Sequence, residues 1–279
     1  MEGLVIKKNA NRFTVECDGK TFELSPSGKT KAKGIFVGDQ VEFGEAITSV
    51  KERKNILIRP PVANIDKMFI VLCPSPKPDF VLIDKILVYC HLSGIEPIIV
   101  INKVDICDEK FVEEINADYG HNYKVLLLSA KSGDVKKLEA EIEGICVLAG
   151  QSAVGKSSII NALFKSENLT EVGDLSAKIE RGKQTTRLVS LYKMENGYLA
   201  DTAGFSLLDL SFVSSITEQE LSSYYPDFLQ ARAKCKYRSC LHEGGECGVK
   251  EDVANGIISP RRYQNYLKIL QELKNAKKY

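Results

Sequence analysis

The chain has 279 residues, a length that suits two or three domains better than one minimal domain. Its 44% hydrophobic and 27% charged residues are ordinary for a globular protein and exclude a fibrous or disordered chain. No apolar run is long enough to span a bilayer, and residues 1–5 lack the layout of a signal peptide. We therefore expect a cytoplasmic protein without membrane contact.

The net charge of +1 conceals an uneven distribution. Residues 1–60 carry 11 Lys and Arg against 8 Asp and Glu, residues 61–231 carry 16 against 24, and residues 232–279 carry 11 against 5. Two basic ends fit contact with a polyanion, although basic ends also occur on proteins that bind none.

The first 60 residues contain short alternating runs separated by turn residues such as Asp18-Gly19. The runs lie at 12–17, 20–24, 39–43 and 46–50. Several strands at this spacing predict a small antiparallel barrel of the OB or SH3-like type. The loop at 29–33 holds three lysines, which either contact a phosphate backbone or are simply solvated.

A boundary follows at Arg59-Pro60-Pro61, because consecutive prolines continue neither a helix nor a central strand. Beyond it, apolar strands alternate with helices. Strands are predicted at 67–72, 97–101 and 123–128, and helices at 79–93, 110–119 and 135–143. This alternation predicts a parallel sheet with helices on both faces.

Two polar motifs follow predicted strands, at the edge where a parallel sheet places its ligands. The first is Asn102-Lys103-Val104-Asp105. The Asp105 carboxylate can accept from guanine N1–H and the exocyclic amine while the Lys103 stem packs on the base, so the motif selects GTP over ATP. The second is Ser129-Ala130-Lys131, where a backbone N–H can meet guanine O6.

A phosphate-binding loop lies between an apolar strand at 145–149 and a helix at 158–164. Its sequence matches G-x-x-x-x-G-K-S and reads Gly150-Gln151-Ser152-Ala153-Val154-Gly155-Lys156-Ser157-Ser158. The glycines let backbone N–H groups surround phosphate oxygens. We expect Lys156 to reach the β- and γ-phosphates and Ser157 to ligate Mg²⁺. The sequence therefore predicts a nucleotide-binding protein.

The residues after this loop are expected to respond to the γ-phosphate. Thr185 or Thr186 is the candidate to close over Mg²⁺, and the sequence does not decide between them. Two further strands lead to a D-x-x-G pattern that begins at Asp201. We expect Asp201 to hold Mg²⁺ through water and the N–H of Gly204 to sense the γ-phosphate.

The eight cysteines fall into two groups. Five are scattered singly, mostly in apolar runs, and are typical of small core residues. The other three flank a histidine, in the order Cys235, Cys240, His242 and Cys247. Four such ligands suit a closed tetrahedral site, so we predict one structural Zn²⁺. Three free cysteines, or a disulfide with one cysteine left over, are the alternatives.

The motif order is that of a circularly permuted GTPase, because N-K-x-D and S-A-K precede the phosphate loop. With a small barrel before it and a cysteine cluster after it, the chain resembles the YjeQ/RsgA family of circularly permuted bacterial GTPases. The resemblance extends to 59–64, 181–186 and 201–205. It implies an OB-type β-barrel at 1–61, a circularly permuted Ras-like α/β P-loop GTPase domain at 62–211 and a mostly helical zinc-binding domain at 212–279.

The resemblance also implies a function. A family member binds the small (30S) ribosomal subunit and its rRNA, assists late maturation and hydrolyses GTP to GDP and phosphate when the subunit activates it. We expect a monomer. Two departures stand out: Gln184 replaces a usual histidine, and the gap before Cys247 is one residue shorter than in the family pattern. Gln184 can still orient water but cannot carry a proton charge.

The catalytic residues are expected to be Lys156, Gln184, Thr185, Thr186, Asp201 and Gly204. Phe205 follows D-x-x-G, where Ras-type enzymes carry a water-orienting glutamine. We therefore expect slow intrinsic hydrolysis that accelerates when a partner orders residues 166–187. The nucleotide state is expected to reorient the C-terminal domain.

Basic residues of the C-terminal region are expected to contact RNA, namely Lys234, Lys236, Arg238, Arg261 and Arg262. Tyr263 and Tyr266 either stack on bases or pack in a core. The alternative function is a GTP-regulated RNA-binding or scaffold protein with incidental slow hydrolysis. An ATP-dependent P-loop kinase is disfavoured by the guanine motif at 102–105.

Overall fold

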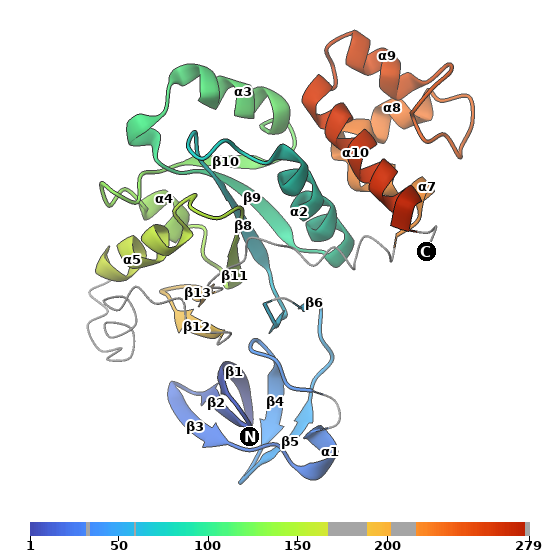
Figure 1. Ribbon diagram of the computed structural model, residues 1–279. Helices are drawn as coiled ribbons and strands as arrows, with labels where there is room; N and C mark the ends of the chain where they lie inside the picture. Colours follow the sequence, from blue (N-terminus) through green and yellow to red (C-terminus); the bar gives the residue numbers. More distant parts are fainter. Residues whose placement is uncertain (32–33, 59, 167–188, 202–215, 277–279) are drawn as a thin grey trace.

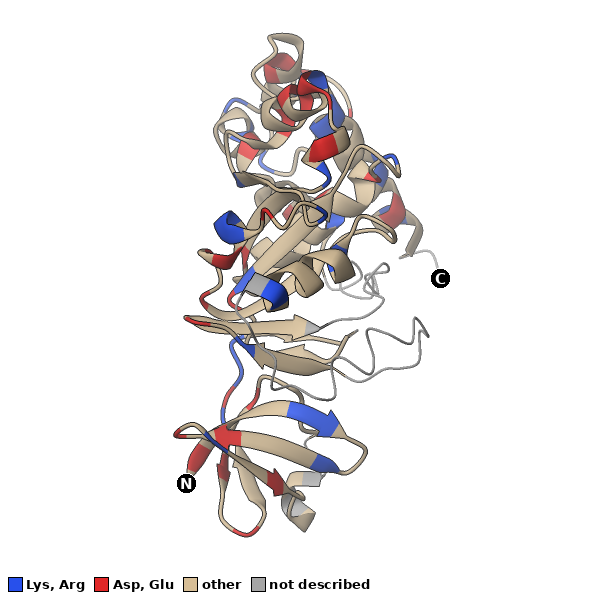
Figure 2. Ribbon diagram, turned by 90° about the vertical axis from the view of Figure 1, so that its left-hand side faces the viewer, with Lys and Arg blue, Asp and Glu red and all other residues tan. Residues whose placement is uncertain are grey.

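The computed structural model describes residues 1–31, 34–58, 60–166, 189–201 and 216–276. Figure 1 shows three parts: the strands of the N-terminal region, a central sheet flanked by helices, and a group of helices formed by the C-terminal region. Turned by 90°, the molecule is elongated, and the central sheet separates the other two parts (Figure 2). Among the described residues, no helix combines the length and the apolar character that crossing a membrane requires.

The N-terminal part is built from five antiparallel strands. They are β1 (Glu2–Asn9), β2 (Arg12–Cys17), β3 (Lys20–Leu24), β4 (Gln40–Phe43) and β5 (Ile47–Val50), with the short helix α1 (Gly28–Lys31) between β3 and β4. β1 lies at the centre, paired with both β2 and β4. Alternate side chains, among them Val5, Phe13 and Val41, form a separate apolar core. The four predicted runs are confirmed as strands. The sequence did not predict β1, because its apolar residues 4–6 are continuous and do not alternate.

The central sheet is mixed. Its parallel strands follow the order β10–β9–β8–β11–β13, with bounds Lys124–Leu127, Glu96–Ile101, Lys67–Leu72, Gly144–Ala149 and Gly197–Asp201. β12 (Ser190–Lys193) is antiparallel to β13 and meets β1 at Lys7↔Ser190, so one continuous sheet includes the N-terminal strands. A two-stranded sheet of β6 (Ile56–Leu57) and β7 (Val62–Ala63) lies at the junction.

Helices cover both faces of this sheet, as predicted. α2 (Phe80–Ser93) and α3 (Glu109–Tyr119) pack on one face, and α4 (Lys136–Glu139) and α5 (Lys156–Ser166) on the other. Met68 and Ile70 of β8 point into the first core, whereas Phe69 and Val71 point into the second.

One predicted helix is shorter than expected. The pattern at 135–143 yields only the four residues of α4. After it, backbone hydrogen bonds run from the N–H of Glu141 to Leu138 O and from the N–H of Ile142 to Glu139 O, three residues back. This tighter spacing still buries Leu138 and Ile142 in one core.

The C-terminal part consists of short helices around one long helix. The elements are α7 (Glu218–Leu221), two 3₁₀ turns (Ser222–Tyr224 and Pro226–Phe228), α8 (Leu229–Ala233), α9 (Gly248–Ala254) and α10 (Pro260–Ala276). α10 packs beside α2 (Figure 1). Val88 of α2 belongs to the C-terminal core, so α2 is buried on two sides.

Candidate functional site

The phosphate-loop motif lies between the end of β11 and the start of α5, so the predicted order of strand, loop and helix is confirmed. Two of its glycines are required by close contacts. A Cβ at Gly150 (φ 128°) would lie 2.2 Å from the carbonyl oxygen of Val71. A Cβ at Gly155 (φ 100°) would lie 2.2 Å from Nδ2 of Asn102. Only glycine fits both the backbone angles and the space.

The Lys156 ammonium group lies inside the loop. Its Nζ donates to the carbonyl oxygens of Gly150 (2.7 Å) and Gln151 (2.8 Å). Burial lowers the pKa of Lys156 to about 8. Phosphate oxygens can replace these two carbonyls as acceptors, and their charge would favour the protonated amine. The side chains of Ser152, Ser157 and Ser158 are exposed beside it.

Ala153 adopts a left-handed backbone with φ 65°. This conformation costs a residue with a Cβ about 1–2 kcal/mol. The carbonyl oxygen of Ala153 accepts a hydrogen bond from Nζ of Lys103 (2.9 Å). Lys103 is itself left-handed, with φ 63°. The phosphate loop and the guanine motif are therefore joined at two strained residues.

Asn102 links all three predicted nucleotide motifs. Its side chain is buried at the end of β9. Nδ2 donates to the carbonyl oxygen of Val154 in the phosphate loop (2.8 Å), and Oδ1 accepts from the N–H of Ala130 in the S-A-K motif (3.1 Å). The segments 102–105, 129–131 and 150–158 thus lie at one edge of the sheet, as the sequence predicted.

The Asp105 carboxylate, in the 3₁₀ turn Val104–Ile106, is positioned by the S-A-K motif. Ser129 donates its hydroxyl to Oδ1 at 2.7 Å, and this hydrogen bond holds the pKa of Asp105 below its ordinary value. The Lys131 amine lies 4.0 Å from Oδ2. An ionised, partly exposed carboxylate is a suitable acceptor for the paired N–H groups of guanine.

Several predicted residues cannot be placed in the same way. Gln184, Thr185, Thr186 and Gly204 lie outside the described residues. Asp201 is the last residue of β13, a parallel neighbour of β11. Since parallel strands end at the same edge, the backbone of Asp201 lies at the edge that carries the phosphate loop.

The predicted metal ligands come together in the C-terminal part. The ligand atoms of Cys235, Cys240, His242 and Cys247 all lie within 4.8 Å of one another. Nδ1 of His242 is 3.5 Å from the Cys235 sulfur and 3.4 Å from the Cys247 sulfur, and these two sulfurs are 3.9 Å apart. Tetrahedral Zn²⁺ with bonds of about 2.1–2.3 Å separates its ligands by roughly 3.5–3.8 Å. The four residues therefore fit a zinc ion.

Burial sets the protonation of these ligands. It lowers the pKa of His242 to about 4, which leaves the imidazole neutral, the form that binds metal. It raises the pKa of the Cys247 thiol to about 11, so a cation is needed to stabilise the thiolate at neutral pH.

The loop that carries the cluster is held by α10. The hydroxyl of Tyr263 donates to the carbonyl oxygen of His242 (2.8 Å), and that of Tyr266 to the carbonyl oxygen of Leu241 (3.0 Å). Both tyrosines are buried. Of the two interpretations that the sequence left open, packing is confirmed, and base stacking is excluded.

The predicted RNA contact of Arg262 is wrong, whereas that of Arg261, which is partly exposed, stays a prediction. The Arg262 side chain is 1% exposed, and its guanidinium group bonds Asp84 of α2 and Asp227 (2.8 Å to the latter). Arg261 pairs with Glu114 and Asp118 of α3. Both arginines join α10 to the central part of the molecule.

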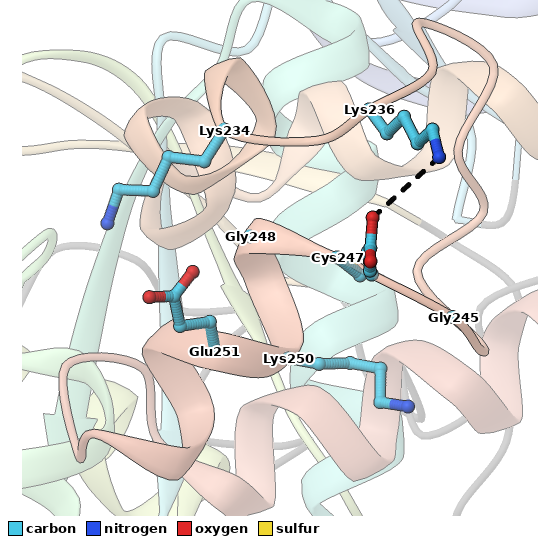
Figure 3. Close-up of a pocket in the computed structure, with 8 residues that line it drawn as sticks. Lys234, Lys236, Gly245, Cys247, Gly248, Lys250 and Glu251 are labelled. Carbon is cyan, nitrogen blue, oxygen red and sulfur yellow. Dashed lines mark ion pairs between the residues drawn. The ribbon is translucent and has the colours of Figure 1, made fainter.

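A shallow cavity of ≈ 430 Å³ lies beside the metal cluster (Figure 3). Its wall contains Lys234, Lys236 and Lys250, together with Glu246 and Glu251. Lys236 is 3.8 Å from Glu246, whereas Lys250 has no ion-pair partner among the described residues. Tyr237, next along the chain, is 64% exposed. Lys234 pairs with the buried Asp252 (2.6 Å), so the amines of Lys236 and Lys250 and the exposed ring of Tyr237 are the groups that this surface offers.

Sequence reasoning missed one part of the nucleotide site, residues 73–79 between β8 and α2. Nζ of Lys103 donates to the carbonyl oxygen of Ser75 (2.8 Å). A signal was present, because three alternating prolines follow a buried strand directly at the ligand edge of the sheet: Pro74, Pro76 and Pro78.

Comparison with known proteins decides the family. The model of the RsgA GTPase family matches residues 50–211. The chain belongs to the RsgA GTPase family. As members of this family do, it hydrolyses GTP, with GTP, GDP and Mg²⁺ as its general ligands. The suspected YjeQ/RsgA resemblance is thus confirmed.

Relatives of the RsgA family match over nearly the whole chain. A protein of Oceanobacillus iheyensis called small ribosomal subunit biogenesis GTPase RsgA 2 is 40% identical, over 99% of this chain and 98% of the relative. A Geobacillus protein called small ribosomal subunit biogenesis GTPase RsgA is 39% identical over 99% and 98%.

Two solved structures are similar as well. YjeQ from Thermotoga maritima has 34% identity and a TM-score of 0.81, covering 98% of each chain. YloQ, described as a circularly permuted GTPase, has 30% identity and a TM-score of 0.79, covering 99% of this chain and 95% of its own. The fold of this chain is therefore that of the circularly permuted GTPases.

Proposed function

We propose that this protein is a GTPase that binds the small ribosomal subunit, assists its late maturation and hydrolyses GTP when the subunit activates it. The observation that carries the proposal is the union of three motifs around Asn102, in a chain that matches small-subunit biogenesis GTPases from end to end. That union builds a guanine and phosphate site from residues otherwise far apart in the sequence.

Each residue of the site has a proposed role. Asp105 accepts from the guanine N1–H and amine, Lys103 packs along the base, and a backbone N–H of the segment 129–131 meets O6. Residues 150–158 surround the phosphates, with Lys156 on the β- and γ-phosphates. Mg²⁺ is held by Ser157, by Asp201 through water, and by Thr185 or Thr186.

Activation is proposed to act on residues outside the guanine and phosphate motifs at 102–105, 129–131 and 150–158. Phe205 cannot polarise water, so Gln184 or a group of the subunit must orient the attacking water. Intrinsic hydrolysis is accordingly slow and accelerates when the subunit orders the chain around Gln184. In the sequence, Asp201 precedes the C-terminal part, whose orientation would follow the nucleotide state.

The proposed organisation has three domains: an OB-type domain at 1–61, the permuted GTPase domain at 62–211 and a zinc-binding domain at 212–279. One Zn²⁺ bound by Cys235, Cys240, His242 and Cys247 would stabilise the last of these. Its charge would keep the three cysteines deprotonated and its geometry would fix the loop at 235–247. We propose a cytoplasmic monomer.

The surface beside the metal cluster supports contact with rRNA. Lys236 and Lys250 can pair with phosphates, and the exposed ring of Tyr237 can stack on a base, whereas Lys234 is held by Asp252. Acidic and basic residues are interspersed over the C-terminal part (Figure 2), so the contact is a local patch and not a wholly basic face.

The test is GTP hydrolysis by the purified protein with and without small ribosomal subunits, with Lys156→Ala as the blank. Stimulation of about a hundredfold, equivalent to about 2.7 kcal/mol of barrier, is the expected result. Rapid turnover by the isolated protein would contradict the activation scheme. Intact GTP binding without any stimulation would instead favour a GTP-regulated RNA-binding or scaffold protein.

A further inference from the structure

The amide group of Gln151 ties the phosphate loop to the segment that precedes α2. Nε2 donates to the carbonyl oxygen of Lys77 (2.9 Å), and Oε1 accepts from the N–H of Asp79 (2.7 Å). Both ends of one side-chain amide are therefore satisfied by one short stretch of backbone. Such a two-point contact fixes distance and orientation together.

The segment at 73–79 is suited to move as one piece. Every second residue from 74 to 78 is proline, which fixes φ and leaves few alternative conformations. The segment ends at Asp79, whose carboxylate accepts from the N–H of Leu82 (3.0 Å) and caps α2. A displacement at Gln151 is thus passed to the first turn of α2.

The first turn of α2 is in turn bonded to α10. Nδ2 of Asn265 donates to the carbonyl oxygen of Phe80, the first residue of α2 (3.1 Å). One turn further, Lys85 of α2 pairs with Glu272 (2.6 Å). α10 then holds the metal-cluster loop through Tyr263 and Tyr266. Direct contacts therefore run from the phosphate loop to the metal cluster.

We propose that Gln151 is a positioning residue that couples nucleotide occupancy to α2, and through α10 to the metal-binding part. The proposal rests on the nucleotide site proposed above. A physical cause lies in the loop itself, because Lys156 bonds the carbonyl oxygen of Gln151. A bound phosphate attracts the ammonium group of Lys156 and so weakens its hydrogen bond to the Gln151 carbonyl. The position of Gln151, which holds the segment at 73–79, changes as a result. By linkage, contacts at α10 must affect nucleotide affinity in return.

The test is a double-mutant cycle on affinity for a fluorescent GDP, with the full-length protein. Gln151→Met keeps the length of the side chain and removes both hydrogen bonds, and Asn265→Leu removes the bond to α2. We expect each variant to weaken GDP binding about threefold or more. The double variant should bind within about twofold of Gln151→Met, because the distant change no longer reaches the loop. Gln264→Ala, on the exposed side of α10, is the matched control and should not alter affinity.

Hydrogen exchange with and without GDP distinguishes coupling from a merely structural role of Gln151. GDP should slow exchange at 80–84 and 260–266 in the wild type but not in Gln151→Met. If Asn265→Leu lowers thermal stability, Glu272→Gln replaces it, since that carboxylate is half exposed. Independent effects that multiply in the double variant, or α10 variants that leave GDP affinity unchanged, would overturn the proposal. If the wild type does not bind GDP, the proposed nucleotide site itself is wrong. That result is obtained before any variant is tested.

Discussion

The two ends of the chain are attached to the central sheet in different ways. The N-terminal strands join through backbone pairing at Lys7↔Ser190 and through apolar side chains such as Leu4 and Val37. The charged contact there is exposed on the lysine side, and Glu16 accepts from Lys193 (2.5 Å) and Tyr198 (3.1 Å). The C-terminal part joins through buried charges, with Arg262 held between Asp84 and Asp227.

This difference indicates which of the two attachments to the central sheet depends on particular side chains. Backbone pairing tolerates substitution, because every residue except proline offers the same N–H and C=O groups. A buried ion pair does not, because loss of one partner leaves the other charged and desolvated. The tyrosines around Arg262 add to this dependence, since its guanidinium group lies 5.0 Å from the Tyr119 ring and 4.7 Å from the Tyr225 ring.

Removal of the metal should have the largest effect, confined to the C-terminal part. We expect about one zinc per chain by mass spectrometry, and its chelation should cost the C-terminal part several kcal/mol of stability. Hydrogen exchange at 235–276 should accelerate strongly, while the strands of residues 2–50 should stay protected. Cys247→Ser should act like the chelator, and Cys17→Ser, outside the cluster, is the control. Equal losses at both ends of the chain would contradict separate stabilisation.

Arg262→Ala should come next, with a loss of about 3–5 kcal/mol in the free energy of unfolding. The reason is that Asp84, wholly buried, loses its counter-charge. Chemical denaturation measures this loss. Arg261→Ala is the matched control, because the side chain of Arg261 is 32% exposed and its loss should cost about 1 kcal/mol or less. Similar losses for the two arginines would show that burial of the pair is unimportant.

Acid should weaken the same joint through His91, by less than the loss of Arg262. Burial and the charge of Arg262 lower the pKa of His91, whose Nε2 lies 3.1 Å from the Tyr123 hydroxyl. The unfolded chain therefore binds the proton more readily, so stability is lost as pH falls below about 6.5. His91→Gln should flatten this decline in thermal melts.

Asp84, in the same cluster, acts in the opposite direction and must be separated from His91. Burial raises the pKa of Asp84 to about 6, against the influence of Arg262. Its stabilising contribution is therefore full below about 3.9 and lost as pH rises through 6. Asp227 is the other charge that faces His91. Because both carboxylates remain in His91→Gln, the difference between variant and wild type isolates the imidazole. A steeper decline in His91→Gln would refute the assignment.

Glu16→Gln, at the N-terminal joint, should have the smallest effect. The pair with Lys193 is exposed on the lysine side, so its loss should cost about 0.5 kcal/mol or less. Thermal melts in low and high salt measure it, and Glu23→Gln on the neighbouring strand is the comparison. A loss that approaches that of Arg262→Ala would remove the distinction between the two joints.

The features that were predicted from the sequence are those that a short local pattern defines. The phosphate loop, the guanine motif and the cysteine cluster are each short and contiguous, so their chemistry is visible without the fold. The alternation of apolar strands and helices along the chain likewise predicted helices on both faces of the sheet. Placing strand ends at one edge of the sheet predicted that the nucleotide motifs lie together, but the joining role of Asn102 was not predicted.

What the sequence could not show depends on pairing between distant residues. Arg262 looks like any surface arginine until Asp84 is brought beside it, so its RNA contact was predicted wrongly. The same holds for α2, whose second buried face is created by α10. Gln151 occupies a variable position of the phosphate-loop pattern, and nothing local indicates that its amide bonds residues 77–79.

The pairing of β1 with β12 also sets an order of events during synthesis. The N-terminal strands lie within the first 50 residues and can fold as soon as they leave the ribosome. Residue 190, the partner of Lys7, emerges only on the order of ten seconds later at ordinary translation rates. For that interval the outer edge of β1 near Lys7 and Lys8 lacks its neighbour, and lysines are residues that protect an open strand edge from other chains.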